Sequence, residues 1–269
     1  MVRSNFPTVK LIDSKENLGF SKGNNLAINQ AGGEYVLLLN PDTVVEENTF
    51  SKVIQYMDSN ADVGGLGVKM IDGKGIFLPE SKRGLPTPEV AFYKIFGLST
   101  LFPTSKKFGA YHLTYLDKDQ THEVDILSGA FMLMRKEALN NVGLLDESFF
   151  MYGEDIDLSY RIQQSGYKNV YYSETQIIHY KGESTKKTSV NYVFVFYKAM
   201  IIFAQKHFTN SNAGTFALII NLAIYFRATL ALIKRLVTQL FLPLLDFTGI
   251  VSGLFLAKEV YHTYTDIPY

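Results

Sequence analysis

Two acidic segments, far apart in the sequence, have the residue types that transfer chemistry on a phosphate-bearing molecule needs. The first is Asn-Pro-Asp at residues 40–42, directly after the apolar run 35–39. The second holds three closely spaced carboxylates, those of Glu154, Asp155 and Asp157. Oxygen ligands suit Mg²⁺ or Mn²⁺, and a carboxylate crowded by others in an apolar-walled cleft can act as a general base. Together the segments predict a divalent-metal site and a proton acceptor.

The first segment predicts a metal ligand at Asp42. Pro41 fixes its own φ and keeps Asn40 extended, so Asp42 is held at the end of a strand with little freedom. One or two protein carboxylates leave room on such an ion for substrate phosphates. The alternative is that Pro-Asp forms only a turn after the strand.

The second segment begins a predicted helix over residues 153–165, where unpaired backbone N–H groups favour negative charge. Asp157 and Arg161 are four residues apart, so an ion pair between them explains Asp157 without any chemistry. An acidic helix start that is only structural is therefore the alternative to a catalytic Asp155 or Glu154.

A third segment contains His179, which follows a strand-like run, and Gly182. A neutral imidazole can complete a metal site, and a glycine lets the backbone approach a phosphate. The alternative is general: a lone histidine is more often a satisfied structural residue.

Alternating strand and helix patterns must position these groups. The apolar runs 35–39 and 63–71 are typical of strands covered on both faces. Between them, four apolar residues recur at helical spacing: Phe50, Val53, Ile54 and Met57. Further strands are predicted at residues 8–12, 124–135, 170–172 and 176–179, and further helices at residues 21–31, 135–141 and 153–165. This order predicts an α/β fold with a wound, mostly parallel sheet that binds ligands at the carboxyl ends of its strands.

Residues 72–121 are rich in glycine, proline and aromatic residues, which predicts a long insertion lining a cleft. The chain has 269 residues, 47% of them hydrophobic, and no cysteine. These values exclude a globally disordered chain, a disulfide scaffold and a thiolate metal site.

The tail differs from the body in charge. Residues 1–185 hold 18 Lys and Arg against 23 Asp and Glu, whereas residues 186–269 hold 8 against 3. Because the basic residues of the tail are interleaved with apolar runs, they favour an anionic membrane surface over nucleic acid. Residues 213–233 reach the ~20 residues of a membrane span only if Arg227 is tolerated, at about 2.5–3.5 kcal/mol. We expect one or two membrane-seated helices; the alternative is an apolar helical pair packed on the domain or on a second subunit.

Five segments resemble, in order, the motifs of family-2 glycosyltransferases, above all the bacterial rhamnosyltransferase-like branch. They are NLGFSKGNN at 17–25, LLLNPDT at 37–43, LSGA at 127–130, GLLDESFFMYGEDIDLSYR at 143–161, and His179, Gly182 and Ser184. The resemblance covers about residues 8–208. It implies an A-type, nucleotide-diphospho-sugar transferase-like fold for residues 1–208, followed by an apolar, basic helical tail at 209–269.

The resemblance also implies roles for single residues. Asp42 and His179 would ligate Mg²⁺ or Mn²⁺, with Asn40 in the first acidic place of an Asp-x-Asp element. Asp155, preceded by Glu154, would take the proton from an acceptor hydroxyl in an inverting transfer. Substrate contacts are expected from eight residues: Asn17, Lys22, Asn25, Asn40, Arg83, Gly129, Asp157 and Ser184.

The implied function is transfer from a nucleotide-sugar donor of the UDP or dTDP type to a glycan or lipid-linked acceptor in cell-surface polysaccharide synthesis. The expected location is the cytoplasm, at the inner face of the cell membrane. No nucleic-acid partner is expected, and the protein could form a homo-oligomer.

Family members normally begin with a strand, a helix and a strand that form much of the nucleotide pocket. Only seven residues precede the first predicted strand here, so we expect an N-terminal truncation of roughly 40–60 residues. The alternatives are a catalytically inactive remnant that binds a glycan or a protein partner, and a regulatory or scaffolding membrane protein.

Overall fold

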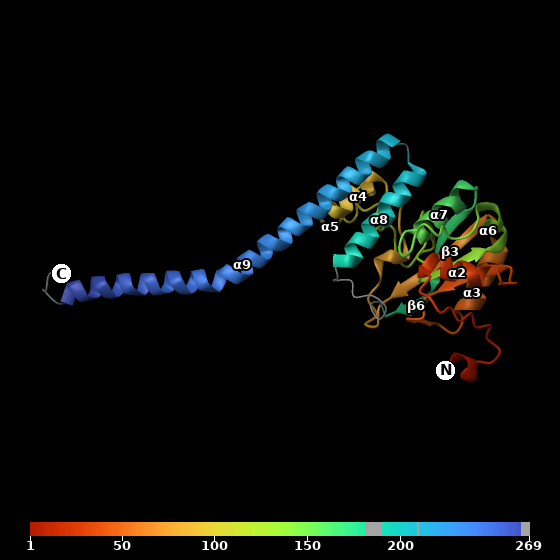
Figure 1. Cartoon of the computed structure of the whole chain (residues 1–269), viewed down its shortest axis with the longest axis horizontal. Coiled ribbons are helices and arrows are strands. Elements are labelled where there is room, and N and C mark those ends of the chain that lie inside the picture. The colour runs from red at the N-terminus through yellow and green to blue at the C-terminus, as the bar shows by residue number, and fades with distance from the viewer. Residues whose placement is uncertain (181–189, 209, 265–269) are drawn as a thin grey trace. The chain divides into compact units, whose positions relative to one another are not determined.

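The computed structural model describes residues 1–180, 190–208 and 210–264, and it divides into two compact units, Met1–Ile219 and Ile220–Tyr269. The strands are β1 (Tyr35–Leu39), β2 (Thr43–Val45), β3 (Val63–Ile71), β4 (His122–Glu123), β5 (Phe131–Arg135) and β6 (Lys168–His179). The helices are α1 (Val2–Asn5), α2 (Gly19–Ile28), α3 (Thr49–Ser59), the 3-10 helix η1 (Pro79–Ser81), α4 (Pro88–Ile95), α5 (Leu98–Leu101), α6 (Lys136–Val142), α7 (Glu154–Gln164), α8 (Val190–His207) and α9 (Asn210–Tyr264) (Figure 1). The domain division expected after residue 208 stays a prediction.

A six-stranded sheet forms the centre of the first unit, in the order β1-β5-β3-β6-β2, with β4 beside β6. β3 and β6 run parallel, and the other described pairs run antiparallel. The α/β class is confirmed, but the sheet is mixed rather than mostly parallel. An apolar run indicates that both faces of a strand are covered, and helices cover both faces of this sheet. The direction of a strand does not change this coverage, so the runs could not predict whether neighbouring strands are parallel.

Strand β5 separates the two layers of the core. Phe131 and Leu133 pack on one side with Met57 of α3, whereas Met132 packs on the other side with Leu158 of α7. The second side is also covered by α2 and α6 through Ile28 and Leu139. Alternate side chains of one strand thus face two separate apolar layers, each fully buried side chain contributing about 1.5–3 kcal/mol.

Three sequence expectations about strands need correction. Of the strand predicted over residues 124–135, only Phe131–Arg135 forms one, β5. Residues 170–172 and 176–179 are parts of one strand, β6, because a bulge places Tyr172 opposite Val68 and Gln176 opposite Lys69. Residues 8–12 form no strand, and Val9 and Leu11 are exposed. A strand needs a neighbour to pair its backbone, and none of the described strands pairs with this segment.

Two contacts tie segments outside the main strands to the first unit: a bridge at Arg83 and the packing of α8. The segment after η1 returns to the body through a bridge between Arg83 and Ile126, and α4 and α5 follow that return. Helix α8 packs on α7, with Met200 and Phe203 buried. The segment 72–121, for which no elements were predicted, thus contains η1, α4 and α5 and is tied to the rest of the first unit at Arg83.

The C-terminal helix α9 contains one stretch, Val237–Thr263, that is long and apolar enough to cross a membrane, with a mean hydropathy of 1.9. This stretch is unburied within the described structure. It lies in the tail for which one or two membrane-seated helices were expected, C-terminal to residues 213–233, and it covers most of two further apolar runs of that tail, at 236–245 and 247–257.

Candidate active site

Strand pairing brings Asp42 and His179 together. The turn after β1 leads into β2, which pairs with the end of β6 so that Thr43 lies opposite His179. The backbone N–H of Tyr180 donates to the carbonyl of Asp42 at 2.9 Å. Nε2 of His179 lies 3.3 Å from Oδ1 of Asp42, and each side chain is 11% exposed. Two potential metal ligands from distant parts of the sequence thus face each other at the end of the sheet.

The backbone of Asn40 fixes the turn that carries Asp42. Its N–H donates to the carbonyl of Ala130 at 3.0 Å, and its carbonyl accepts from Oγ1 of Thr43 at 2.7 Å. These bonds tie the turn to the start of β5. The side chain of Asn40 remains available to line a cavity.

Asp155 lies in the first turn of α7 and is held by several donors. Nη2 of Arg83 donates to its Oδ2 at 2.5 Å, and the N–H of Gly129 lies 3.4 Å from the same oxygen. The N–H of Ile156 donates to Oδ1 at 2.8 Å. Arg83 also donates to the carbonyl of Leu127. Burial disfavours the charge of Arg83, but Asp155, together with Tyr111 and Glu154, opposes burial, and the pKa of Arg83 is raised. The contact with Asp155 therefore favours the charged form of Arg83.

Glu154 lies beside this pair in a less polar environment. The residue is 5% exposed. Burial, followed by the charge of Asp155, raises the pKa of Glu154 to about 8, although Arg83 opposes the shift. Burial and the neighbouring carboxylate thus favour the protonated, uncharged form of Glu154.

The loop before α7 has a backbone conformation that fixes these two carboxyl groups. Tyr152 and Gly153 have φ values of +67° and +86°, in the left-handed region. For a bulky residue such as Tyr152 that conformation is uncommon and costs free energy. Strained backbone of this kind is concentrated at functional sites, which favours the start of α7 as one.

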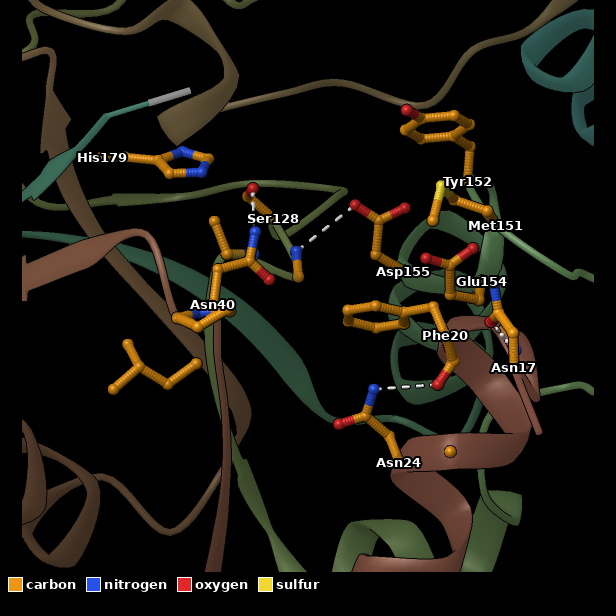
Figure 2. Close-up of a pocket in the computed structure, with 16 residues that line it drawn as sticks. Asn17, Phe20, Asn24, Asn40, Ser128, Met151, Tyr152, Glu154, Asp155 and His179 are labelled. Carbon is orange, nitrogen blue, oxygen red and sulfur yellow. Dashed lines mark hydrogen bonds between the residues drawn. The ribbon is translucent and has the colours of Figure 1, made fainter. Parts of the chain in front are cut away.

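A cavity of about 560 Å³ connects these groups. Figure 2 shows Asn40, Ser128 and His179 on one side and Phe20, Glu154 and Asp155 on the other. Gly129 lies beside Phe20 and Asp155, since a Cβ added there would lie 3.4 Å from Phe20 and 3.7 Å from the Cβ of Asp155, which are ordinary contact distances. The cavity therefore presents both the carboxyl pair and the imidazole to one bound molecule.

Six of the predicted site residues line the cavity: Asn17, Asn40, Gly129, Glu154, Asp155 and His179. Asp42 and Arg83 do not line the cavity themselves. Asp42 contacts His179, and Arg83 contacts Asp155, and both of these partners line it. Lys22 is exposed and is not among the lining residues. Ser184, like Gly182, lies outside the residues that the structure describes.

Asp157 faces away from the cavity. Its side chain is fully buried and accepts from Nε of Arg161 at 2.8 Å and from Nε2 of His207 at 2.6 Å. Nζ of Lys206 lies 2.8 Å from the same carboxylate. The predicted Asp157–Arg161 ion pair is confirmed, and it belongs to the interface between α7 and α8.

Asn25 also forms internal contacts rather than lining the cavity. Its Nδ2 donates to the carbonyl of Leu145 at 2.8 Å, and its Oδ1 accepts from the N–H of Leu145 at 3.1 Å. These two hydrogen bonds connect α2 to the loop before α7. Asn25 therefore positions the cavity wall instead of contacting its contents.

The prediction did not single out several lining residues, namely Phe20, Asn24, Ser128, Met151 and Tyr152. All of them lie within the motif segments quoted above, so the spacing of the motifs was the available signal. Residue type gave no further signal, since aromatic and small polar side chains are equally common in a core or a turn.

Comparisons with known proteins found similar sequences and a similar fold. A family model described as "Glycosyltransferase like family 2" matches residues 1–191. The N-acetylglucosaminyl-diphospho-decaprenol L-rhamnosyltransferase of Mycobacterium tuberculosis is 26% identical over 214 residues, which are 75% of this chain and 69% of that protein. The rhamnosyltransferase WbbL of Escherichia coli is 27% identical over 172 residues, 60% of this chain and 61% of that protein.

Among solved structures, a crystal structure of GalNAc-T7 with UDP, GalNAc and Mn²⁺ superposes with a TM-score of 0.50 at 15% identity. The match covers 73% of this chain and 36% of that one. This likeness concerns the fold, and this chain spans about a third of the length of that protein.

Proposed function

Since the chain belongs to the glycosyltransferase-like family 2, we propose that it transfers a sugar from a nucleotide-sugar donor to a glycan or lipid-linked acceptor in cell-surface polysaccharide synthesis. The observation that carries this proposal is the cavity into which Asp155, Glu154 and His179 all face. A rhamnosyl or other hexosyl group is the transferred sugar favoured by the relatives. We place the transferase in residues 1–208, with residues 209–269 as its tail.

In this mechanism Asp155 is the general base. Its carboxylate takes the proton of an acceptor hydroxyl as that oxygen forms a bond to the anomeric carbon of the donor. The bond from the anomeric carbon to the diphosphate oxygen breaks on the opposite side, and the nucleoside diphosphate leaves with the electron pair. Direct displacement inverts the anomeric configuration. Gly129 and Arg83 hold the carboxylate in place through the contacts described above.

The residues present fit a divalent cation. Oδ1 of Asp42 is buried and accepts no hydrogen bond within the described part of the chain, although His179 Nε2 lies 3.3 Å away. A separation near 3 Å is typical of two neighbouring ligands of one octahedral ion at ~2.1 Å. The described residues contain no group of three His, Cys, Asp or Glu side chains that could hold a metal ion. Mg²⁺ is commonly held by one or two protein carboxylates, with water and substrate phosphate as its other ligands. The cation would stabilise the charge of the departing diphosphate.

We further propose that the protein acts at the cytoplasmic face of a membrane. Val237–Thr263 is long enough to cross the hydrocarbon core, and its side chains are unburied in the described structure. Lys234 and Arg235 precede it directly, and basic residues flanking a span favour the cytoplasmic side. A lipid-linked acceptor would be delivered to the same surface.

The proposal is tested by transfer from a panel of UDP-, dTDP- and GDP-linked sugars, with Mg²⁺ or Mn²⁺. The acceptor is a short-chain N-acetylglucosaminyl-diphospho-prenol, by analogy with the name of the mycobacterial relative. Asp155→Asn should lower kcat by about 10²–10⁴-fold, whereas the control Asp13→Asn, at an exposed carboxylate, should not. Absence of transfer and of donor hydrolysis across the panel would contradict the proposal and favour a glycan-binding remnant.

A further inference from the structure

Glu154 combines deep burial with an unused oxygen in the cavity wall. The residue is 5% exposed and lines the cavity. Its Oε2 has no hydrogen-bond partner among the residues that the structure describes. A buried polar atom without a partner is unfavourable, so an atom of this kind in a cavity wall points to a ligand that supplies the partner.

The groups around Glu154 favour its protonated form. Asp155, its neighbour on α7, raises the pKa of Glu154, and Arg83, which opposes that shift, donates its hydrogen bond to Asp155. Burial acts in the same direction as the charge of Asp155 and raises the pKa of Glu154 to about 8. His179 at the end of β6 is the titratable group that lines the cavity from another element. Near pH 7 Glu154 therefore has an O–H group to donate.

We propose that Glu154 is an uncharged hydrogen-bond donor that holds a hydroxyl of the acceptor beside the reacting hydroxyl at Asp155. Neighbouring hydroxyls of a sugar fit this pair, because one gives its proton to a carboxylate while the oxygen of the next accepts from a carboxylic acid. The acceptor class is thus a sugar with adjacent hydroxyl groups. This inference rests on the proposed function and assigns part of its acceptor specificity to one residue.

Two variants of similar size separate donation from charge. Glu154→Gln keeps a neutral donor, whereas Glu154→Met removes it. The kinetics are measured at pH 7 with the short-chain N-acetylglucosaminyl-diphospho-prenol acceptor. Glu154→Met should raise the acceptor KM about tenfold, and Glu154→Gln should raise it no more than about threefold. The donor KM should be the same in both variants. An equal rise in acceptor KM in Glu154→Gln and Glu154→Met, or a rise in the donor KM alone, would overturn the proposal.

Infrared spectroscopy of the full chain provides a readout that does not need turnover. The wild type should show a protonated-carboxyl C=O band at pH 6.5 that disappears at pH 9.5 and is missing in Glu154→Gln. The same acceptor should shift this band, because the O–H group gains a partner. No band, or a band that the bound acceptor leaves unchanged, would overturn the proposal even if transfer occurs. A shifted band without transfer from any donor would support Glu154 as an acceptor contact and contradict only the proposed catalysis.

Discussion

Arg83 and Asp155 form an ion pair, 2.5 Å between Nη2 and Oδ2, in which the side chains are only 13% and 16% exposed. They are far apart in the sequence, and the return of the chain after η1 brings them together. Arg83 was expected to contact the donor. Its contacts with Asp155 and with the carbonyl of Leu127 instead make it a positioning residue for the proposed base.

Replacing Arg83 should therefore affect kcat more than the donor KM. Arg83→Gln should lower kcat by about 10²-fold, because a misplaced base loses reactive geometry. Arg83→Lys should recover part of the loss, since it keeps the charge but loses the planar set of donors. Steady-state kinetics with Arg3→Gln, an exposed arginine, as control tests this. A tenfold rise in donor KM at unchanged kcat would assign Arg83 to the donor instead.

Removal of either proposed metal ligand should weaken the response to metal. Asp42→Ala and His179→Ala should each raise the Mn²⁺ concentration for half-maximal activity by about tenfold or more. Mn²⁺ titration in the presence of UDP, followed by electron paramagnetic resonance, checks binding without turnover. His122→Ala is the matched control, because His122 does not line the cavity. Unchanged titrations in both variants would show that the pair does not bind the ion.

The buried carboxylate of Asp157 should stabilise the protein at neutral pH. Burial would raise the pKa of Asp157, but hydrogen bonds from Lys206 and His207 and the charge of Arg161 lower it below its ordinary value. A carboxylate whose pKa is lower in the folded state than in the unfolded state stabilises the fold at pH values above its unfolded-state pKa, near 4. This stabilisation is lost as the pH falls through the folded-state pKa. Asp157→Asn should cost about 3–5 kcal/mol at pH 7 and less at pH 3.

Urea unfolding at both pH values measures this difference. Asp62→Asn is the control, because the Asp62–Lys168 pair is exposed. A loss of stability in Asp157→Asn that is equal at pH 3 and pH 7 would contradict the electrostatic explanation.

Two glycines of α2 should respond oppositely to alanine. Gly19 has a φ of +73°, and a Cβ there would lie 2.5 Å from the carbonyl oxygen of Phe150. Gly19→Ala should therefore cost at least 1–2 kcal/mol through backbone strain. Gly23 lies inside the helix, and a Cβ added there would have no neighbouring atom within 4 Å, so Gly23→Ala should gain up to about 1 kcal/mol. Thermal unfolding of the two variants gives the sign of each change.

The C-terminal helix should hold the protein in membranes. Leu254→Arg places a charge near the middle of Val237–Thr263 and should cost about 2.5–3.5 kcal/mol of insertion. The expected result is loss of carbonate-resistant membrane association relative to wild type. Lys258→Arg, which keeps the charge, is the control. Full recovery of wild type in the soluble fraction would contradict a spanning helix.

The local elements that carry the site were predictable because each has a local cause. The Asn-Pro-Asp turn follows from the restricted backbone of Pro41, and the start of α7 follows from its acidic first turn and glycine cap. Helix α3 follows from apolar spacing, and Val53 and Met57 are indeed buried. By contrast, residues 8–12 have a strand-like composition without a strand, because pairing is a property of two segments.

What the sequence by itself determined was the family, the elements that have a local cause, and the residue types available for chemistry. Only the tertiary structure decided which carboxylate faces the cavity. Successive helical residues are rotated by about 100°, so Asp155 and Asp157 point to nearly opposite sides of α7. Packing of α8 on one side buries Asp157 among Arg161, Lys206 and His207. On the other side, Arg83 arrives from a distant segment and contacts Asp155 at the cavity. The spacing of Asp157 and Arg161 predicted their ion pair, but no local pattern predicted the contacts with Lys206, His207 and Arg83.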